Sequence, residues 1–377
     1  MRVLYFSDNS SVHNRRFLEK LASFGHEMWF LDATRDAPPE WPLPAGVRWV
    51  RPDRTIPRGA EPSAFEDFLP TLRSIVTALT PDLVHSGPIQ SCAYVAALAG
   101  FHPLLVMSWG SDLLLHANRN EEWRHATEIA LQAADGFVCD CDAARASALR
   151  FAPLPESRIA QFPWGVKRGS FSPIGPVPPA DQLALPVGAV PFICTRAWEP
   201  FYGVDVLLSA FHLAYSRNNL LRLILLGSGS AAGYVHDFIA GHHLQEVVLT
   251  PGAVPESELA AWFRAATAYV SCVESDGTSV SLLEAMATGL PVIVTDNASN
   301  REWVTPGENG WLAAAGSAEE FAEKLLLTAA LTAEERKAIS FRNRQVVERR
   351  ADWDANFPRL LHLYESVVGS PAGRQAG

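Results

Sequence analysis

Hydrophobic positions along this 377-residue chain fall into short apolar runs that alternate with segments of helical periodicity. Residues 12–24 have apolar side chains at three- and four-residue spacing, which is typical of an amphipathic helix. Short continuous apolar runs bounded by turn residues are instead typical of buried strands. They occur at 3–6, 83–85, 104–108, 136–139, 192–195, 222–226, 247–249, 268–273 and 292–295. This alternation predicts an α/β fold whose parallel sheets are covered by helices on both faces.

A proline-rich segment divides the alternation into two series. Residues 172–191 contain six prolines, which favour extended backbone and are typical of a linker. The chain is long enough for two domains of ordinary size. We therefore expect two doubly wound, Rossmann-like domains, with their sheets facing a central cleft. The expected boundaries are 1–171 for the first domain, 172–191 for the linker, 192–352 for the second domain, and 353–377 for a C-terminal helix that packs back on the first.

The sequence ESDGTSVSLLEAMATG, residues 274–289, places one carboxylate in an otherwise apolar helix. The helix follows a predicted buried strand, and Thr278 and Ser279 are favourable N-cap residues. A helix start presents unpaired N–H groups and the positive end of the helix dipole, which together bind phosphate. If Glu284 is buried, it needs polar partners, and the vicinal hydroxyls of a ribose would supply them. The alternative is that Glu284 faces solvent on an ordinary helix.

This stretch resembles the signature of the retaining GT-B glycosyltransferases of family four, also called group 1. Their pattern is an acidic residue, seven residues, and then Glu-Ala-Met-Ala-x-Gly-x-Pro-Val, and Asp276 and Glu284 occupy its two acidic positions. Further segments match in the family's order: FPWGV with FSP, TRAWEPFYGVDVLLSAF, LILLGSGS and NREWVTPGENGWL. The resemblance covers most of the C-terminal half closely and the N-terminal half loosely. It implies a GT-B architecture.

The resemblance also implies roles for individual residues. Glu284 would hold the ribose of a nucleotide-sugar donor, and Asp276 would face the transferred sugar. Arg196 corresponds to the family's phosphate-binding arginine, and its planar guanidinium suits phosphate oxygens. Taken without the family context, Arg196 is equally well explained by a surface ion pair with Glu199. The remaining donor-side candidates follow the first acid: Gly277, Thr278, Ser279 and Val280.

The chain departs from the family pattern at several positions. Tyr202 stands where the family usually has a lysine, six residues after the arginine, and Asp276 replaces the more common glutamate. Asn9, Ser10 and Ser11 replace the glycine-rich first loop, so we take Ser10, Ser11 and Tyr202 as further donor-side candidates.

In the first domain, SWGSD has a tryptophan where the family often has a histidine. Trp109 and Asp112 are acceptor-side candidates. A core tryptophan with a helix-capping aspartate explains them equally well.

Two other motifs have simpler explanations. The run GSGSAAG from Gly227 fits a dinucleotide fingerprint, but no acidic residue ends the next strand. We interpret Gly227 as part of a tight strand-to-helix turn beside the donor. The DCDAA run at 140–144 imitates a metal-binding pair but suits a strand end followed by a helix cap. No metal site is expected.

Composition and charge narrow the classes of partner. The chain is 48% hydrophobic and 19% charged, typical of a globular enzyme, and its net charge of −10 argues against a nucleic-acid partner. Five cysteines lie beside apolar residues, which favours buried free thiols in a reducing compartment. No apolar run is long enough to span a membrane. We expect a cytoplasmic location, with peripheral contact at the inner face of the cell membrane left open.

The family resemblance, with which these features agree, implies a hexosyltransferase of polysaccharide biosynthesis. It would move a sugar from a nucleotide-diphosphate sugar to an acceptor hydroxyl, with retained configuration and without a metal or a cofactor other than the donor. The acceptor can be a glycan, a lipid-linked glycan or a small molecule. Two alternatives stay open: a GT-B epimerase or hydrolase of nucleotide sugars, and a non-catalytic carbohydrate-binding partner subunit.

Overall fold

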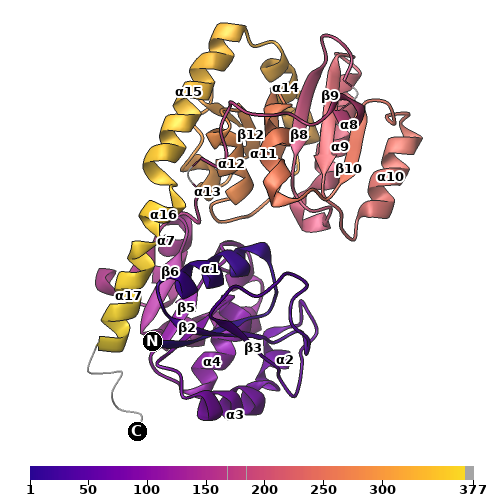
Figure 1. The fold of residues 1–377 in the computed structure, drawn as a ribbon. Coiled ribbons are helices and arrows are strands. Elements are labelled where there is room, and N and C mark those ends of the chain that lie inside the picture. Colours follow the sequence, from indigo (N-terminus) through magenta and orange to yellow (C-terminus); the bar gives the residue numbers. More distant parts are fainter. Residues whose placement is uncertain (168, 184, 370–377) are drawn as a thin grey trace. The chain divides into compact units, whose positions relative to one another are not determined.

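The structure, a computed structural model, describes residues 1–167, 169–183 and 185–369. It divides into two compact units, each built on a parallel sheet (Figure 1). Unit 1 contains Met1–Phe162 and the chain from Phe357 onward, and unit 2 contains Pro163–Asn356. The chain therefore changes unit after Phe162 and again after Asn356.

Unit 1 is built on a seven-stranded sheet with the order β3-β2-β1-β4-β5-β6-β7, in which all neighbouring strands are parallel. Its strands are β1 (Arg2–Ser7), β2 (Glu27–Asp32), β3 (Val47–Val50), β4 (Leu83–Ser86), β5 (Leu104–Met107), β6 (Gly136–Cys139) and β7 (Ile159–Gln161). Its helices are α1 (Val12–Ser23), α2 (Pro62–Glu66), α3 (Leu69–Leu79), η1 (Ile89–Ala93), α4 (Tyr94–Ala99), α5 (Ser111–Leu114), η2 (His116–Asn118), α6 (Glu121–Gln132), α7 (Asp142–Phe151), η3 (Glu156–Arg158) and α17 (Pro358–Gly369).

The last helix, α17, packs against β6 and β7 of unit 1. Its Tyr364 hydroxyl lies 2.6 Å from Nδ1 of His85 on β4, and both side chains are buried. The rings of Tyr5 of β1 and His85 form a T-shaped pair with their centres 4.8 Å apart, so this face of the sheet has an aromatic core. Leu4 and Phe6, which alternate with Tyr5, belong to the core cluster on the opposite face. The two-residue period of the strand thus places apolar side chains on both faces.

Unit 2 is built on a six-stranded parallel sheet with the order β10-β9-β8-β11-β12-β13. Its strands are β8 (Val190–Cys194), β9 (Leu221–Leu226), β10 (Val248–Gly252), β11 (Ala268–Ser271), β12 (Val292–Thr295) and β13 (Gly310–Ala313). Its helices are α8 (Ala180–Leu183), η4 (Pro200–Tyr202), α9 (Val204–Tyr215), α10 (Ala232–Gly241), α11 (Glu256–Arg264), α12 (Val280–Ala287), α13 (Ala298–Arg301), α14 (Ala318–Ala329), α15 (Ala333–Arg350) and α16 (Trp353–Asn356).

Both faces of the second sheet are also covered. Phe192 of β8 joins a cluster with α9 and α14, whereas the next residue, Ile193, joins a cluster with α11, α12 and α15. The predicted strands of both series are present, and the doubly wound α/β class is confirmed.

The sequence pattern missed strands β2, β3, β7 and β13. Three of them are edge strands with a partner on one side only, and they are three or four residues long. Edge strands need no continuous apolar run, which is why β3, β7 and β13 gave little signal. Strand β2 lies inside the sheet, and its run Met28–Leu31 was the signal available for it.

The proline-rich segment differs from the expected linker. Residues 172–191 lie within unit 2 and begin ten residues after Phe162, where the chain leaves unit 1. Of the predicted linker and C-terminal segment, residue 184 and residues 370–377 lie outside the described residues. Arg264 explains the difference, because its guanidinium donates to the carbonyls of Ser172 (3.1 Å) and Pro176 (3.0 Å). A Cβ on Gly175 would lie 2.7 Å from Cζ of Arg264. The start of the segment is thus fastened to α11.

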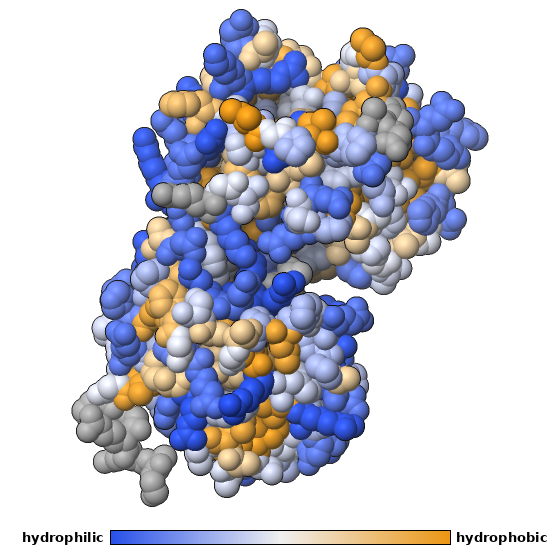
Figure 2. Space-filling model, in the orientation of Figure 1, coloured by the Kyte–Doolittle hydropathy of each residue, from blue (hydrophilic) through white to orange (hydrophobic). Residues whose placement is uncertain are grey.

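Hydrophilic residues cover much of the visible face of each unit, with hydrophobic residues in smaller groups between them (Figure 2). Within the described ranges, every helix is too short or too polar to cross a bilayer.

Candidate functional site

The candidate site of unit 2 is built from loops that follow three neighbouring strands. Arg196 follows β8, Asp276 follows β11, and Asn297 follows β12. Strand β11 pairs with both β8 and β12, and the three strands are parallel. Their carboxyl ends therefore meet at the same edge of the sheet. Arg196 and Asp276 are 80 positions apart in the sequence, and Asn297 follows Asp276 after about 20 more, yet all three lie at this edge.

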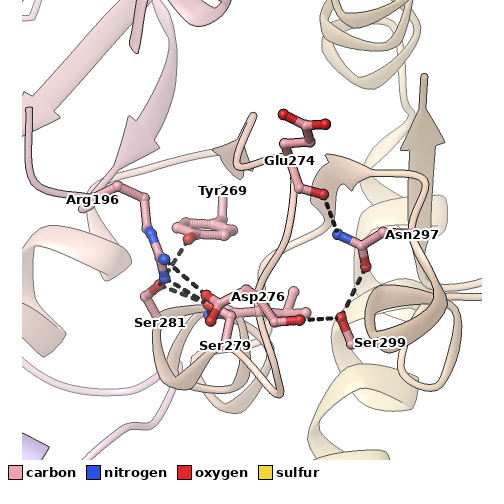
Figure 3. A network of polar contacts seen from close by, with 9 residues as sticks. Arg196, Tyr269, Glu274, Asp276, Ser279, Ser281, Asn297 and Ser299 are labelled. Carbon is pink, nitrogen blue, oxygen red and sulfur yellow. Dashed lines mark hydrogen bonds and ion pairs between the residues drawn. The ribbon is translucent and has the colours of Figure 1, made fainter. Parts of the chain in front are cut away.

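Arg196 and Asp276 form the central ion pair of this site (Figure 3). Nη2 of Arg196 donates to Oδ2 of Asp276 over 2.7 Å. Nη1 donates to the hydroxyls of Ser279 (3.1 Å) and Ser281 (3.4 Å), which lie at the start of α12. The guanidinium is therefore held at the helix N-terminus. Glu199, the alternative partner, instead accepts from the backbone N–H of Ser230 (3.1 Å), so the surface-pair explanation of Arg196 is wrong.

Burial and neighbouring charges act in opposite directions on this arginine. The side chain of Arg196 is 13% exposed and that of Asp276 is 20% exposed. Burial alone would lower the pKa of Arg196, but Asp276 and Tyr269 raise it above its ordinary value. Burial raises the pKa of Tyr269 to about 12 although Arg196 opposes this shift. The phenol stays neutral, and it lies 2.8 Å from the hydroxyl of Ser281. The site thus holds a permanent cation.

Tyr202, which replaces the family's lysine, packs against Arg196. Cζ of Arg196 lies 4.3 Å from the centre of the Tyr202 ring, a cation–π distance. The next residue, Gly203, has φ of +66°, and a Cβ there would lie 2.5 Å from the carbonyl oxygen of Cys272, the first residue after β11. Only glycine permits this close approach, which fixes η4 and its tyrosine beside the arginine.

Gly227 supports the same arginine from the backbone side. It has φ of +102°, and a Cβ on it would lie 3.0 Å from the carbonyl oxygen of Arg196. The backbone N–H of Trp198 donates to the carbonyl of Ser228 (2.9 Å), and the Trp198 indole donates to that of Leu226 (3.0 Å). The glycine-containing segment connects β9 to α10, so its interpretation as a strand-to-helix turn is confirmed.

The loop that carries Asp276 is anchored by α13. The single O–H of Ser299 is shared between two acceptors, the carbonyl of Asp276 (2.7 Å) and Oδ1 of Asn297 (2.9 Å). Nδ2 of Asn297 donates to the carbonyl of Glu274 (3.2 Å). Asn297 is also the N-cap of α13. Sequence reasoning missed Asn297, Ser299 and Tyr269. An Asn-x-Ser cap signature directly after β12 was the available signal for the first two.

Helix α12 begins as predicted, with Ser279 as its N-cap accepting from the N–H of Leu282 (3.4 Å). Gly277 and Thr278 are buried, and Val280 is half-buried. Glu284 is also half-buried, whereas the residues on either side of it, Leu283 and Ala285, are buried. Glu284 is thus neither fully buried nor fully exposed, so its burial lies between the two explanations considered for it.

The remaining candidates lie in unit 1. Ser11 is the N-cap of α1 and accepts from the N–H of Asn14 (3.3 Å). Ser10 donates to Oδ2 of Asp32 over 2.7 Å. Trp109 is half-buried after β5, and the centres of its ring and the Phe17 ring lie 6.3 Å apart in a T-shaped arrangement.

Asp112 is buried and accepts from the hydroxyl of Ser108 (2.5 Å) and from the N–H groups of Trp109 (3.1 Å) and Ile89 (3.2 Å). Burial raises its pKa, and these hydrogen bonds oppose the shift.

No group of three or more His, Cys, Asp or Glu residues in the described ranges could hold a metal ion. All five cysteines are buried and free. In the DCDAA run, Cys141 is the N-cap of α7 and its sulfur accepts from the N–H of Ala144 (3.4 Å), in agreement with a strand end and helix cap.

Comparison with known proteins identifies the family. Residues 190–330 match the family described as glycosyl transferases group 1, and residues 2–141 match the family described as glycosyl transferase 4-like. The chain belongs to the group 1, family-four-like glycosyltransferases. The family resemblance of its motifs is thereby confirmed.

Individual relatives are more distant. A protein of Escherichia coli (strain K12), named as the colanic acid biosynthesis glycosyltransferase WcaL, is 28% identical over 200 residues, or 52% of this chain and 48% of that protein. The chain thus spans about half the length of this curated relative.

Two solved structures share the fold of this chain over nearly its whole length. Sucrose-phosphate synthase from Thermosynechococcus elongatus has a TM-score of 0.80 at 18% identity, covering 98% of this chain and 99% of that one. Anabaena HepE, solved in complex with UDP and glucose, has a TM-score of 0.76 at 16% identity, covering 97% and 100%. The GT-B fold class is confirmed.

Proposed function

We propose that the chain transfers a hexosyl group from a nucleotide-diphosphate sugar to an acceptor hydroxyl, with retained configuration. The observation that carries this proposal is the position of Arg196, a partly buried cation held at the N-terminus of α12 by Asp276 and two serines. In this proposal unit 2 binds the nucleotide sugar, and unit 1 supplies the acceptor side.

The proposed chemistry depends on stabilising the diphosphate as it leaves. Negative charge develops on the leaving oxygen when the sugar–oxygen bond breaks, and a preorganised cation and helix N-terminus stabilise it without reorganisation. The contacts of Arg196 with Asp276, Ser279 and Ser281 use three of its five N–H donors. The other two donors can engage phosphate oxygens. Protein groups therefore supply the positive charge in this mechanism.

Glu284 is proposed to accept hydrogen bonds from the ribose hydroxyls. It lies one turn after the start of α12, and its side chain leans back toward that start, where the diphosphate would bind. Its half-burial leaves it accessible to a ligand while its neighbours remain in the core. Gly277, Thr278, Ser279 and Val280 would line the same donor site.

The donor and acceptor classes are suggested by relatives. HepE was solved with UDP and glucose, which supports a UDP-sugar as the first donor to test. The WcaL protein is named for colanic acid biosynthesis, which supports a role in polysaccharide assembly. The five buried free thiols support action in a reducing compartment such as the cytoplasm.

A thermal-shift screen of UDP-, GDP-, ADP- and TDP-sugars, followed by measurement of nucleoside diphosphate release, tests the proposal. A bound donor at 100 times its Kd should stabilise the fold by about 2.7 kcal/mol. Release that requires an acceptor supports transfer. Conversion of the donor alone would instead identify an epimerase or hydrolase, and binding without any turnover would identify a non-catalytic subunit.

Glu284→Gln is the matched test of the ribose contact. It should weaken UDP binding by about 10-fold or more, since a hydrogen bond to a charged group contributes about 1.5–3 kcal/mol. Calorimetry with UDP and 2′-deoxy-UDP separates this role from a general loss of structure. The variant should lose the wild-type preference for UDP, and an unchanged preference would exclude the ribose role.

A further inference from the structure

Unit 1 contains a cavity of about 180 Å³ at the carboxyl ends of its central strands. Its lining includes Asp8, Ser91, Trp109, Asp112, His116 and Trp123. The sheet order runs from β1 through β2 to β3 in one direction and from β4 to β7 in the other. The strand order therefore reverses between β1 and β4, and ligands of open α/β sheets bind at such a switch point. Asp8 follows β1 directly, which places its carboxylate at this position.

Asp8 has the capacity to bind a ligand hydroxyl. Its Oδ2 accepts from the hydroxyl of Ser91 (2.7 Å), and its Oδ1 accepts from Nδ2 of Asn9 (3.0 Å). Each carboxylate oxygen has a second lone pair, so one further hydrogen bond to each is possible. The two existing bonds fix the orientation of the carboxylate beside the cavity. Asp8 is thus a preorganised hydrogen-bond acceptor.

Asp112, the other carboxylate of the lining, has a structural role. It accepts from the hydroxyl of Ser108 and from the backbone N–H groups of Ile89, at the start of η1, and of Trp109, which follows β5. These contacts fasten the cavity wall. The group left to recognise a ligand is therefore Asp8 rather than the sequence-predicted Asp112.

Aromatic side chains form the apolar part of the lining. The Trp123 indole donates to Glu61, and the Arg119 guanidinium lies 5.1 Å from the centre of the Trp123 ring. The His116 ring meets the Trp123 ring edge-on at 5.2 Å. Rigid aromatic surfaces beside a few oriented polar groups suit a ligand with both C–H faces and hydroxyls, such as a sugar ring.

The charge of the lining disfavours anions. The described lining residues include two carboxylates and no lysine or arginine. Burial raises the pKa of Asp8 to about 6, and the negative charge of Asp32 raises it further. Hydrogen bonds from Ser91 and Asn9 and the positive charge of Arg58 lower the pKa of Asp8 and so limit this shift. Burial also lowers the pKa of His116. The nearby charge of Arg119 lowers this pKa further, whereas the charge of Asp112 raises it. At pH 7.5 Asp8 is ionised and His116 neutral, so a phosphate or carboxylate in the cavity would be repelled.

We infer that this cavity binds the ring of a neutral, hydroxyl-rich acceptor, and that Asp8 accepts a hydrogen bond from one of its hydroxyls. The ligand class is a sugar or cyclic polyol without a phosphate or carboxylate on the bound ring. A cavity of about 180 Å³ suits one ring rather than an oligosaccharide chain. This inference rests on the proposed function, for which it specifies the acceptor.

Ligand-observed saturation-transfer NMR on the full chain at pH 7.5, without donor, tests the inference. The probes are monosaccharides and cyclic polyols, each paired with its phosphate ester: glucose with glucose 6-phosphate, mannose with mannose 6-phosphate, and myo-inositol with its monophosphate. At least one neutral ring should bind, with its ester at least about tenfold weaker. Asp8→Asn should weaken binding of the neutral ring by about tenfold or more. Asp8→Asn should also reduce the difference in affinity between the neutral ring and its phosphate ester, because the negative charge that repels the phosphate is removed.

Asp36→Asn is the matched control, because Asp36 is an exposed carboxylate of unit 1 that pairs with Arg51. It should leave ring binding unchanged. Stronger binding of any ester than of its neutral ring overturns the inference without requiring a variant, and so does a failure of all neutral rings to bind. If donor is bound and turned over while no ring binds, only this inference fails. If rings bind but no donor is used, the proposed transfer fails instead.

Discussion

Replacing Arg196 by alanine is the most direct test of how the unit 2 site works. The change removes the 2.7 Å ion pair with Asp276, two hydrogen bonds to serine hydroxyls, and the cation over the Tyr202 ring. It also removes the cation proposed to meet the diphosphate. Since the guanidinium is 13% exposed, water compensates for only part of the loss.

The expected loss of rate can be estimated from these contacts. A hydrogen bond to a charged group contributes about 1.5–3 kcal/mol, and each 1.36 kcal/mol of transition-state stabilisation changes a rate about tenfold. Arg196→Ala should therefore lower kcat/KM by about 10- to 150-fold. The kcat/KM of Arg196→Lys should lie between those of Arg196→Ala and the wild type, since an ammonium keeps the positive charge but lacks the planar pair of donors.

The assay is initial-rate release of nucleoside diphosphate, with thermal unfolding measured on the same samples. Removing the arginine leaves Asp276 without its counter-ion, which destabilises the fold, so Arg196→Ala is combined with Asp276→Asn to relieve that effect. Arg301→Ala is the control, because it breaks an exposed ion pair with Asp296 in the same unit. A normal kcat/KM in folded Arg196→Ala would refute the phosphate role.

Three further predictions concern residues that hold the unit 2 site in place or stabilise the fold: Tyr202, Gly203 and His85. Tyr202→Phe should keep nucleotide affinity, whereas Tyr202→Ala should weaken it by about two- to fivefold in calorimetry, the value of a cation–π contact of about 0.5–1 kcal/mol with Arg196. Gly203→Ala should lower the unfolding free energy in urea by about 2 kcal/mol or more, because its Cβ would meet the carbonyl of Cys272 at positive φ. Burial lowers the pKa of His85 to about 3, below its ordinary 6.5, so His85 stabilises the fold above about pH 6.5 and this contribution is lost as the pH falls toward 3. The wild type should therefore lose about 2 kcal/mol more between pH 7 and pH 5 than His85→Phe does in urea unfolding.

The controls for these predictions use matched positions. Gly316 has φ of +74° but open space around its Cβ position, so Gly316→Ala should cost less than Gly203→Ala, and equal costs would contradict the role of the close approach. Equal affinities of the Tyr202 alanine and phenylalanine variants would contradict the cation–π support. An identical pH dependence with and without His85 would show that other groups set acid stability.

Local sequence rules determined nine of the thirteen strands described in this protein and the start of α12. Two-residue and 3.6-residue periods depend on neighbours within a turn or a strand, so the alternation of strands and helices could be predicted. Ser279 was likewise predictable as an N-cap, because its hydroxyl accepts from an N–H three residues later. The family signature then pointed to Asp276 and Glu284 by their spacing alone.

Only the tertiary structure decided which of these residues meet. Arg196 joins Asp276, and Asn297 anchors the same loop, because β8, β11 and β12 are adjacent in the sheet although they are far apart in the sequence. Strand order is a property of the whole sheet, and periodicity does not report it. In the same way, Asp8 lies at the cavity of unit 1 because β1 pairs with β4 where the strand order reverses.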